Sequence, residues 1–427
     1  MSSLTGGRSF CTPILQTPLL LLVSALLSFG MWFFVYQVWA PQTEMHFSDL
    51  YPRWYGSREL LLHHRDPYDP SVTREIQVWA HGQPLESGPE NAAKDGDRFA
   101  YPVYIAFVLA PTVGLQFPQV VRLFRFLCPV LICVSVPLWL YMLRWRCSRW
   151  TLGSLILLCL GSFPALECIY LQQPVLLAIL FMAAAGASLT SGRLGWAGAL
   201  FALATIKPQL TALLVPWLLL WACSDWPSRK RLVWGFSSTL LLLLAFSQYL
   251  VPGWIIEFLA GLRAYQRYTG NMSILAVYFT KTGSAVVSAG LIAAWAGLAW
   301  QMRKLPARSR AFNFTVCASL AITVVLIPTL YPTGQVALWP AIFFMLMEFP
   351  MIWNNGRASR LAYVGAFSLI GWPWLGAWLF VLASLAIPMV RLKQFWLVPL
   401  STLVLVPLSL LVLFSINLPA LIRSPAP

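Results

Sequence analysis

The side chains best suited to acid–base chemistry gather in one stretch of the chain, residues 41–100. Ten of the fourteen acidic residues and all four histidines lie there, in a chain of 427 residues of which 10% are charged. Asp49 follows shortly after the first apolar run, in Phe-Ser-Asp-Leu-Tyr. A carboxylate at a lipid–water boundary can act as a general base towards a sugar hydroxyl. The alternative is that Asp49 caps the N-terminus of a helix.

Lys207 is the second candidate, because it lies near the middle of the apolar segment 194–222. A charge inside such a segment costs free energy and is therefore a functional candidate. Its ammonium would suit a lipid-linked phosphate. The alternative is a lysine whose head group extends to the surface from a kinked helix.

Two further connections between apolar runs carry donors and acceptors that suit sugar hydroxyls. Each of these residues is also a common type at a membrane interface, and this alternative stays open. They are Glu167, Gln172 and Gln173 in the first connection, and Arg263, Arg267, Asn271 and Ser273 in the second.

Other polar residues favour an architectural role. Asp66-Pro67-Tyr68-Asp69-Pro70 is typical of a tight turn. His63 and His64 are adjacent, so they point in different directions on a helix, and no metal-ligand spacing is present. A solvated face is the better interpretation of the histidines, and Gly-rich phosphate loops, nucleophile elbows and zinc motifs are absent from the sequence.

The elements that position these residues must be helices in a bilayer. The chain is 59% hydrophobic, and long apolar runs recur from residue 14 to residue 418, at lengths suited to a membrane crossing. Helices satisfy their own backbone groups in lipid. We expect an all-α polytopic bundle with roughly 10 to 13 crossings, forming one integral membrane domain over residues 1–427. Its parts are a first span at 14–40, an extracytoplasmic catalytic loop at 41–100, further helices over 101–418, and a tail at 419–427.

Charge sets the expected orientation. The net charge of +15 is spread over short basic clusters between the apolar runs, which follows the positive-inside pattern and argues against a nucleic-acid partner. With these clusters inside, the loop 41–100 and the connections 170–174, 252–281 and 331–336 share the outer face. We expect a multi-pass protein of the plasma (bacterial inner) membrane with its active face extracytoplasmic. None of the eight cysteines lies in the loop, which excludes a disulfide framework there.

Three segments carry specific expectations. Residues 47–62 suggest an interfacial helix interrupted near Pro52. Residues 194–222 suggest a re-entrant or hairpin helix broken at Pro208. If 101–117 crossed fully, the arginines at 144–149 would lie outside, so this segment either inserts partly or breaks the charge rule.

The order of motifs resembles glycosyltransferase family 87, integral membrane enzymes of the GT-C class similar to polyprenyl-phosphate-mannose-dependent mannosyltransferases. The resemblance covers most of residues 14–350, and it departs from the family pattern at Val103, Gln172 and Val175, where proline, glycine and asparagine are usual. The matching places are Asp49 with the aromatic residues after it, 65–70, 99–102, 164–173, 197–208 and, loosely, 271–273.

The resemblance implies a metal-independent, inverting transfer without a cofactor. Asp49 would take a proton from the acceptor hydroxyl, and Lys207 would steady the leaving phosphate. Near 331–336 the family often carries histidine, whereas this chain has Gln335 and no histidine there. The implied partners are a polyprenyl-phosphate hexose or pentose, mannose-like, a lipid or glycan acceptor, and membrane lipids, with no nucleic acid. The candidate binding residues are Lys207, Glu167, Gln173, Arg263, Arg267, Asn271 and Gln335, and no metal ligand is expected.

Two other functions fit the same asymmetry of charge. One is a lipid-linked glycan transporter, although no internal repeat is visible in the sequence. The other is a glycan polymerase or ligase that uses lipid-linked donors but takes a longer acceptor.

Overall fold

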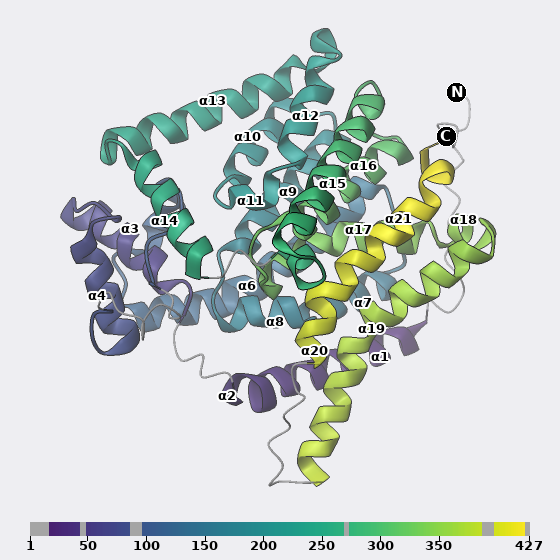
Figure 1. Ribbon diagram of the computed structural model, residues 1–427, viewed down its shortest axis with the longest axis horizontal. Helices are drawn as coiled ribbons and strands as arrows, with labels where there is room; N and C mark the ends of the chain where they lie inside the picture. The colour runs from purple at the N-terminus through teal and green to yellow at the C-terminus, as the bar shows by residue number, and fades with distance from the viewer. Residues whose placement is uncertain (1–16, 43–47, 86–95, 269–272, 387–396, 423–427) are drawn as a thin grey trace.

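The computed structural model describes residues 17–42, 48–85, 96–268, 273–386 and 397–422. Every regular element in these ranges is a helix, which confirms the all-α expectation (Figure 1). The backbone groups of an apolar chain are thereby satisfied within each segment, as a bilayer requires.

Six of the described helices are long and apolar enough to cross a membrane. They are α1 with η2 (Pro18–Trp39), α6 (Phe117–Leu143), α13 (Trp226–Leu250), α15 (Lys281–Met302), α19 (Arg357–Ala386) and the segment of α20, η7 and α21 (Leu397–Ile422). A seventh arises if α7 (Arg149–Leu160) and α8 (Phe163–Tyr170), bent by 57°, form one span. The chain is therefore a multi-pass membrane protein.

Five apolar segments of 10–17 residues lie among these long helices in the described ranges. The expectation of 10 to 13 crossings counted every apolar segment, whereas the structure separates full-length helices from shorter ones. The shorter segments are α9 (Val175–Thr190), α10 (Leu194–Ala204), α12 (Leu214–Cys223), α16 (Arg310–Leu326), and η6 (Pro332–Leu338) with α17 (Trp339–Met347).

Helix α16 is the centre of the core. Every residue from Ala311 to Val325 is buried, including three hydroxyl residues. Their hydroxyl groups donate to backbone carbonyls one turn earlier, so they need no partner outside the helix. These residues are Thr315, Ser319 and Thr323.

The loop after the first span folds into two helices, α3 (Tyr51–His63) and α4 (Pro70–His81). Pro52 lies in the first turn of α3, where a missing N–H costs nothing, so the expected interruption near Pro52 is wrong. Phe47 lies outside the described residues. Helix α3 ends at His64, whose φ of 55° is left-handed.

The Asp66–Pro70 segment is the tight turn that its composition predicts. The Tyr68 N–H donates to Asp66 Oδ1 at 2.9 Å, and the Ser71 N–H donates to Asp69 Oδ1 at 2.6 Å. Asp69 is therefore the N-cap of α4. His63 and His64 are exposed, as expected for a solvated face.

The segment 101–117 contains two short helices, α5 (Ile105–Leu109) and η4 (Ala110–Thr112). Eight residues of helix rise about 12 Å, well short of the hydrocarbon thickness. The structure thus favours the partial insertion, and the arginines at 144–149 no longer conflict with the charge rule.

The segment 194–222 is broken where the sequence predicts. Helix α10 ends at Ala204, and the short α11 (Pro208–Thr211) begins directly after Lys207. Gly198 holds α10 tightly against α13, since a Cβ at Gly198 would lie 2.1 Å from the Leu232 carbonyl oxygen. Glycine permits this close approach of two backbones.

The connection 252–281 is largely helical. It contains α14 (Trp254–Tyr268) and η5 (Ile274–Val277). Figure 1 shows α14 beside α3 and α4, at one end of the molecule. The remaining short elements are α2 (Ala40–Gln42) and α18 (Phe349–Asn354).

Candidate active site

Asp49 precedes α3 and lies against the turn that joins α8 to α9. Gln173 Nε2 donates to Asp49 Oδ2, and Ser48 Oγ donates to the Leu171 carbonyl at 3.2 Å. The N-cap of α3 is Leu50, so Asp49 does not hold the capping position that was the alternative for it. The hydrogen bonds of Gln173 and Ser48 thus hold the Asp49 carboxylate against a segment that is more than 120 residues away in the sequence.

The turn under Asp49 has an unusual backbone. Gln172 has a left-handed φ of 51° and is 1% exposed. Its Nε2 donates to the carbonyls of Ile169, at 3.0 Å, and Tyr170. Glycine adopts such a φ without strain, which gives a physical reason for the glycine usual at this place in the family pattern. Here side-chain hydrogen bonds hold a glutamine in the same conformation.

Arg53 lies one turn into α3 and faces the same region. Its Nη1 donates to the Asp49 carbonyl at 2.7 Å, and its guanidinium carbon lies 5.0 Å from the centroid of the Tyr101 ring. Arg53 was not among the predicted residues. No sequence signal singles it out, because arginine is an ordinary residue in a polar loop.

Glu167 is buried in α8, with 4% of its surface exposed. Its Oε2 has no hydrogen-bond partner among the described residues. Asp49 and Lys207 both act on it electrostatically. A buried carboxylate oxygen without a partner is costly in a finished core, so this one is a candidate to bind a ligand or a neighbouring cation.

Lys207 occupies the break between α10 and α11 and is 5% exposed. Its Nζ lies 4.8 Å from the ring centroid of Tyr331, and Tyr101 and Arg53 are within electrostatic range. The Tyr104 hydroxyl donates to the Thr205 carbonyl at 2.9 Å and so attaches this break to the segment after the loop. A lysine whose head group extended to the surface would be exposed, and Lys207 is not.

The structure therefore brings Asp49, Gln173, Glu167 and Lys207 into one cluster and adds Arg53 to it. Three separate chain segments contribute: the residues around the start of α3, the α8–α9 region and the α10–α11 break. The cluster combines carboxylates with cations in largely buried surroundings, which suits proton transfer beside a developing negative charge.

The remaining candidates differ in exposure and in their partners. Arg263 and Arg267 are exposed on α14, and Asn271 lies outside the described residues. Gln335 is buried in η6, and its Nε2 donates to the Leu403 carbonyl at 2.7 Å, while its Oε1 has no partner in the described ranges. Ser273 caps η5 by accepting from the Ala276 N–H at 3.3 Å.

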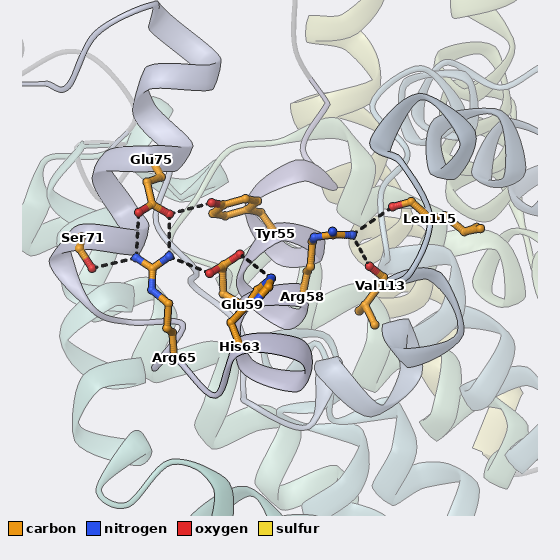
Figure 2. A network of polar contacts seen from close by, with 9 residues as sticks. All are labelled: Tyr55, Arg58, Glu59, His63, Arg65, Ser71, Glu75, Val113 and Leu115. Carbon is orange, nitrogen blue, oxygen red and sulfur yellow. Dashed lines mark hydrogen bonds and ion pairs between the residues drawn. The ribbon is translucent and has the colours of Figure 1, made fainter.

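A polar network positions α3, and with it the first side of the cluster (Figure 2). Arg65 Nη1 donates to Glu59 at 2.7 Å, and Arg65 Nη2 donates to Glu75 at 2.8 Å, joining α3 to α4. Hydrogen bonds from Arg65, and then from Tyr55, hold the pKa of Glu75 below its ordinary value. Arg58 Nη1 donates to the Val113 carbonyl at 2.6 Å. The loop is thereby anchored to the segment that follows η4.

An all-helical chain with several membrane-spanning helices and a buried cluster of acids and cations defines a multi-pass membrane protein with an enzyme-like site. The family model of glycosyltransferase family 87 matches residues 99–328, more than half of the chain. The chain belongs to this family and is a membrane glycosyltransferase. The search of curated proteins and the search of solved structures each gave no match. Glu167, Gln173 and Lys207 lie inside the matched residues, whereas Asp49 precedes them.

Proposed function

We propose that this glycosyltransferase is a GT-C enzyme that transfers a mannose-like hexose or a pentose from a polyprenyl-phosphate donor to a lipid or glycan acceptor. The transfer inverts the anomeric configuration, uses no metal or other cofactor, and takes place on the extracytoplasmic face of the plasma (bacterial inner) membrane. The observation that carries the proposal is the proximity of the oriented Asp49 carboxylate to the buried Lys207 and the partly buried Arg53.

Asp49 acts as the general base. Its carboxylate takes the proton of an acceptor hydroxyl, and the hydroxyl oxygen attacks the anomeric carbon of the donor. The bond between that carbon and the phosphate oxygen breaks, and its electron pair leaves with polyprenyl phosphate. The hydrogen bond from Gln173 holds the carboxylate in one orientation, which limits the reorganisation needed for proton transfer.

Lys207 and Arg53 stabilise the charge that develops on the leaving phosphate. An ammonium that is 5% exposed has lost most of its hydration, so an arriving phosphate interacts with it more strongly than in water. Glu167 shares this environment and is assigned to holding Lys207 in place for the donor. Inversion requires the base and the leaving phosphate to lie on opposite sides of the reacting carbon, so the proposal places the donor sugar between Asp49 and Lys207.

The outer face follows from charge. Acidic residues concentrate in the segment 41–100 that supplies Asp49, while basic clusters follow the other apolar runs. The donor lipid would enter from the bilayer, and its phosphate would meet Lys207 in the break of 194–222.

The test is a transfer assay with the purified full-length chain, radiolabelled polyprenyl-phosphate sugars and an extract of membrane lipids and glycans as acceptors. Asp49→Asn should lower the rate at least about a hundredfold, since a positioned base contributes roughly 10²–10⁴. The matched control is Asp66→Asn, in which the asparagine oxygen can still accept from the Tyr68 N–H, and its rate should stay near wild type. Full activity of Asp49→Asn, or transfer from nucleotide sugars and from no lipid-linked donor, contradicts the proposal.

A further inference from the structure

A cavity lies between α4 of the loop and α14, and none of the residues in the Asp49–Lys207 cluster lines it. Its volume is about 650 Å³, within the range of sites that hold drug-sized molecules. A disaccharide or trisaccharide has this size, whereas a single sugar ring would leave much of the space empty.

The two helices face each other across this cleft with matched spacing. Thr73, Arg74 and Gln77 form one stripe of α4, and Glu257, Ala260 and Gly261 form one stripe of α14. Glu257, Ala260 and Gly261 follow an i, i+3, i+4 pattern and Thr73, Arg74 and Gln77 an i, i+1, i+4 pattern, and spacings of three and four place side chains on a single face. These stripes are polar or small, so the helices do not close on each other through apolar side chains as amphipathic helices usually do.

The chemistry of the lining suits sugar hydroxyls. Arg74 and Arg98 supply donors and Glu257 supplies acceptors, and a hydroxyl group both donates and accepts. The rings of Tyr68 and Phe99 form the aromatic part of the lining, with their centroids 5.3 Å apart in an edge-to-face arrangement. An acyl chain would instead need an apolar groove.

The wall near α4 is held in place before any ligand binds. Gln77 Nε2 donates to the Gly96 carbonyl at 2.9 Å, and its Oε1 accepts from the Leu85 N–H at 3.1 Å. His81 Nε2 lies 2.6 Å from Asp97 Oδ2. These contacts hold the non-helical residues around Leu85 and Gly96 against α4, so little conformational freedom is lost on binding.

The cleft is connected to the candidate active site through one residue layer. The Tyr68 hydroxyl donates to the Tyr101 carbonyl at 2.5 Å, and the Arg53 guanidinium carbon lies 5.0 Å from the centroid of the Tyr101 ring. A molecule against Tyr68 is therefore separated from the cations by Tyr101.

We infer that this cleft binds an oligosaccharide of two or three units, the glycan part of the acceptor, which makes a glycan head rather than a bare lipid the group that is recognised. The assignment to the acceptor rests on the proposed transferase function, whereas the binding itself does not. The glycan can be free or attached to a lipid, and the two sources share the chemistry that the cleft recognises.

The first experiment measures binding directly by saturation-transfer NMR, with the full-length chain in lipid nanodiscs so that no glycosidic detergent competes. The probes are mannotriose, maltotriose, cellotriose and xylotriose, each free in one arm and attached to a lipid anchor in the nanodisc in the other. Wild type should bind at least one probe. Binding in the anchored arm alone, with the same dependence on the cleft, assigns the glycan to a glycolipid and supports the inference.

Gly261→Trp is the decisive variant. A Cβ at Gly261 meets no atom within 4 Å, and replacing glycine inside a helix does not weaken it, so the indole fills the cleft without disturbing α14. It should lower probe affinity at least about tenfold, and Arg74→Gln and Arg98→Gln should each lower it by a similar factor through lost charged hydrogen bonds. Leu259→Trp changes an exposed neighbouring residue of α14 that does not line the cleft, and it should bind the probes as wild type does.

The outcomes separate this inference from the proposed function. Asp49→Asn should bind the probes normally, since Asp49 is not part of the cleft. Cleft-dependent binding without any sugar transfer by wild type removes the proposed function and leaves the binding site. No binding of any probe by wild type, or equal affinity of Gly261→Trp and Leu259→Trp, overturns the inference, as does an acceptor KM in Gly261→Trp equal to that of wild type.

Discussion

Replacing Lys207 with methionine removes a buried positive charge and nearly preserves the length of the side chain. The ammonium is 5% exposed and lies 4.8 Å from the Tyr331 ring centroid. A buried cation on an aromatic ring gains about 2 kcal/mol from that contact, but it has also lost its hydration, which costs several kcal/mol. These two terms offset each other, but the buried Glu167 loses the ammonium that acts on it, so Lys207→Met should fold with a melting temperature below that of wild type.

The effect on transfer should be much larger. Removing one group that stabilises a developing anion costs about 2.7–4 kcal/mol of the barrier, which is roughly 10²–10³ in rate. We expect Lys207→Met to lose this factor in kcat/KM for the polyprenyl-phosphate donor, with the acceptor KM almost unchanged. Lys207→Arg, which keeps the charge in a different shape, should lose less.

The assay is single-turnover transfer from a radiolabelled polyprenyl-phosphate sugar, with donor and acceptor concentrations varied separately. Lys281→Met is the matched control, because Lys281 is exposed at the first turn of α15. Donor kinetics equal to those of wild type in folded Lys207→Met would refute the phosphate role. An equal rise of donor and acceptor KM would refute it as well, since it would indicate general distortion of the site.

Two further predictions concern the turn under Asp49 and the pH response of the loop. Gln172→Gly should keep transfer activity, whereas Gln172→Val should lose about 1–2 kcal/mol of stability and should lose activity by displacing Gln173, because a β-branched residue tolerates the φ of 51° poorly. Chemical unfolding and transfer rates of the two variants check this prediction, and equal behaviour of the two would contradict it. The pKa of Glu75 is lowered in the folded chain, so its contribution to stability is present above its ordinary pKa of 4.5 and is lost as the pH falls through the lower folded value. On acidification below pH 4.5, the melting temperature of Glu75→Gln should therefore fall less steeply than that of wild type, and parallel curves would contradict this prediction.

The main features of the fold were predictable because lipid imposes them. Long apolar runs can form little else than helices, and the proline after Lys207 locates the break in 194–222. Hydropathy does not decide between a full crossing and a partial insertion of 101–117, because it measures composition, and short apolar helices have the same composition as a membrane span. The interruption at Pro52 was predicted wrongly because the start of α3 was placed several residues too early, and a proline is harmful inside a helix but not in its first turn.

Candidate residues were predictable where a polar side chain conflicts with an apolar surrounding. Lys207 and Glu167 are of this kind, and the structure buries both in one cluster. Arg53 lies in a polar loop where arginine is ordinary, so its position near Tyr101 could come only from tertiary contacts. Arg263 and Arg267 are the opposite case: they are exposed, and charged residues in a connection between apolar segments can serve solvation as well as binding.

The distance in sequence between the two sides of the cluster has a consequence for biosynthesis. Asp49 is synthesised early, whereas Tyr331, whose ring centroid lies 4.8 Å from Lys207 Nζ, is synthesised much later. At roughly 5–20 residues per second, this interval is about 15 to 60 s, during which the cluster lacks Tyr331. The contacts of Arg65 with Glu59 and Glu75 are local to the loop and can form within it. Helices α3 and α4 can thus form a folded unit before the later helices of the enzyme are synthesised.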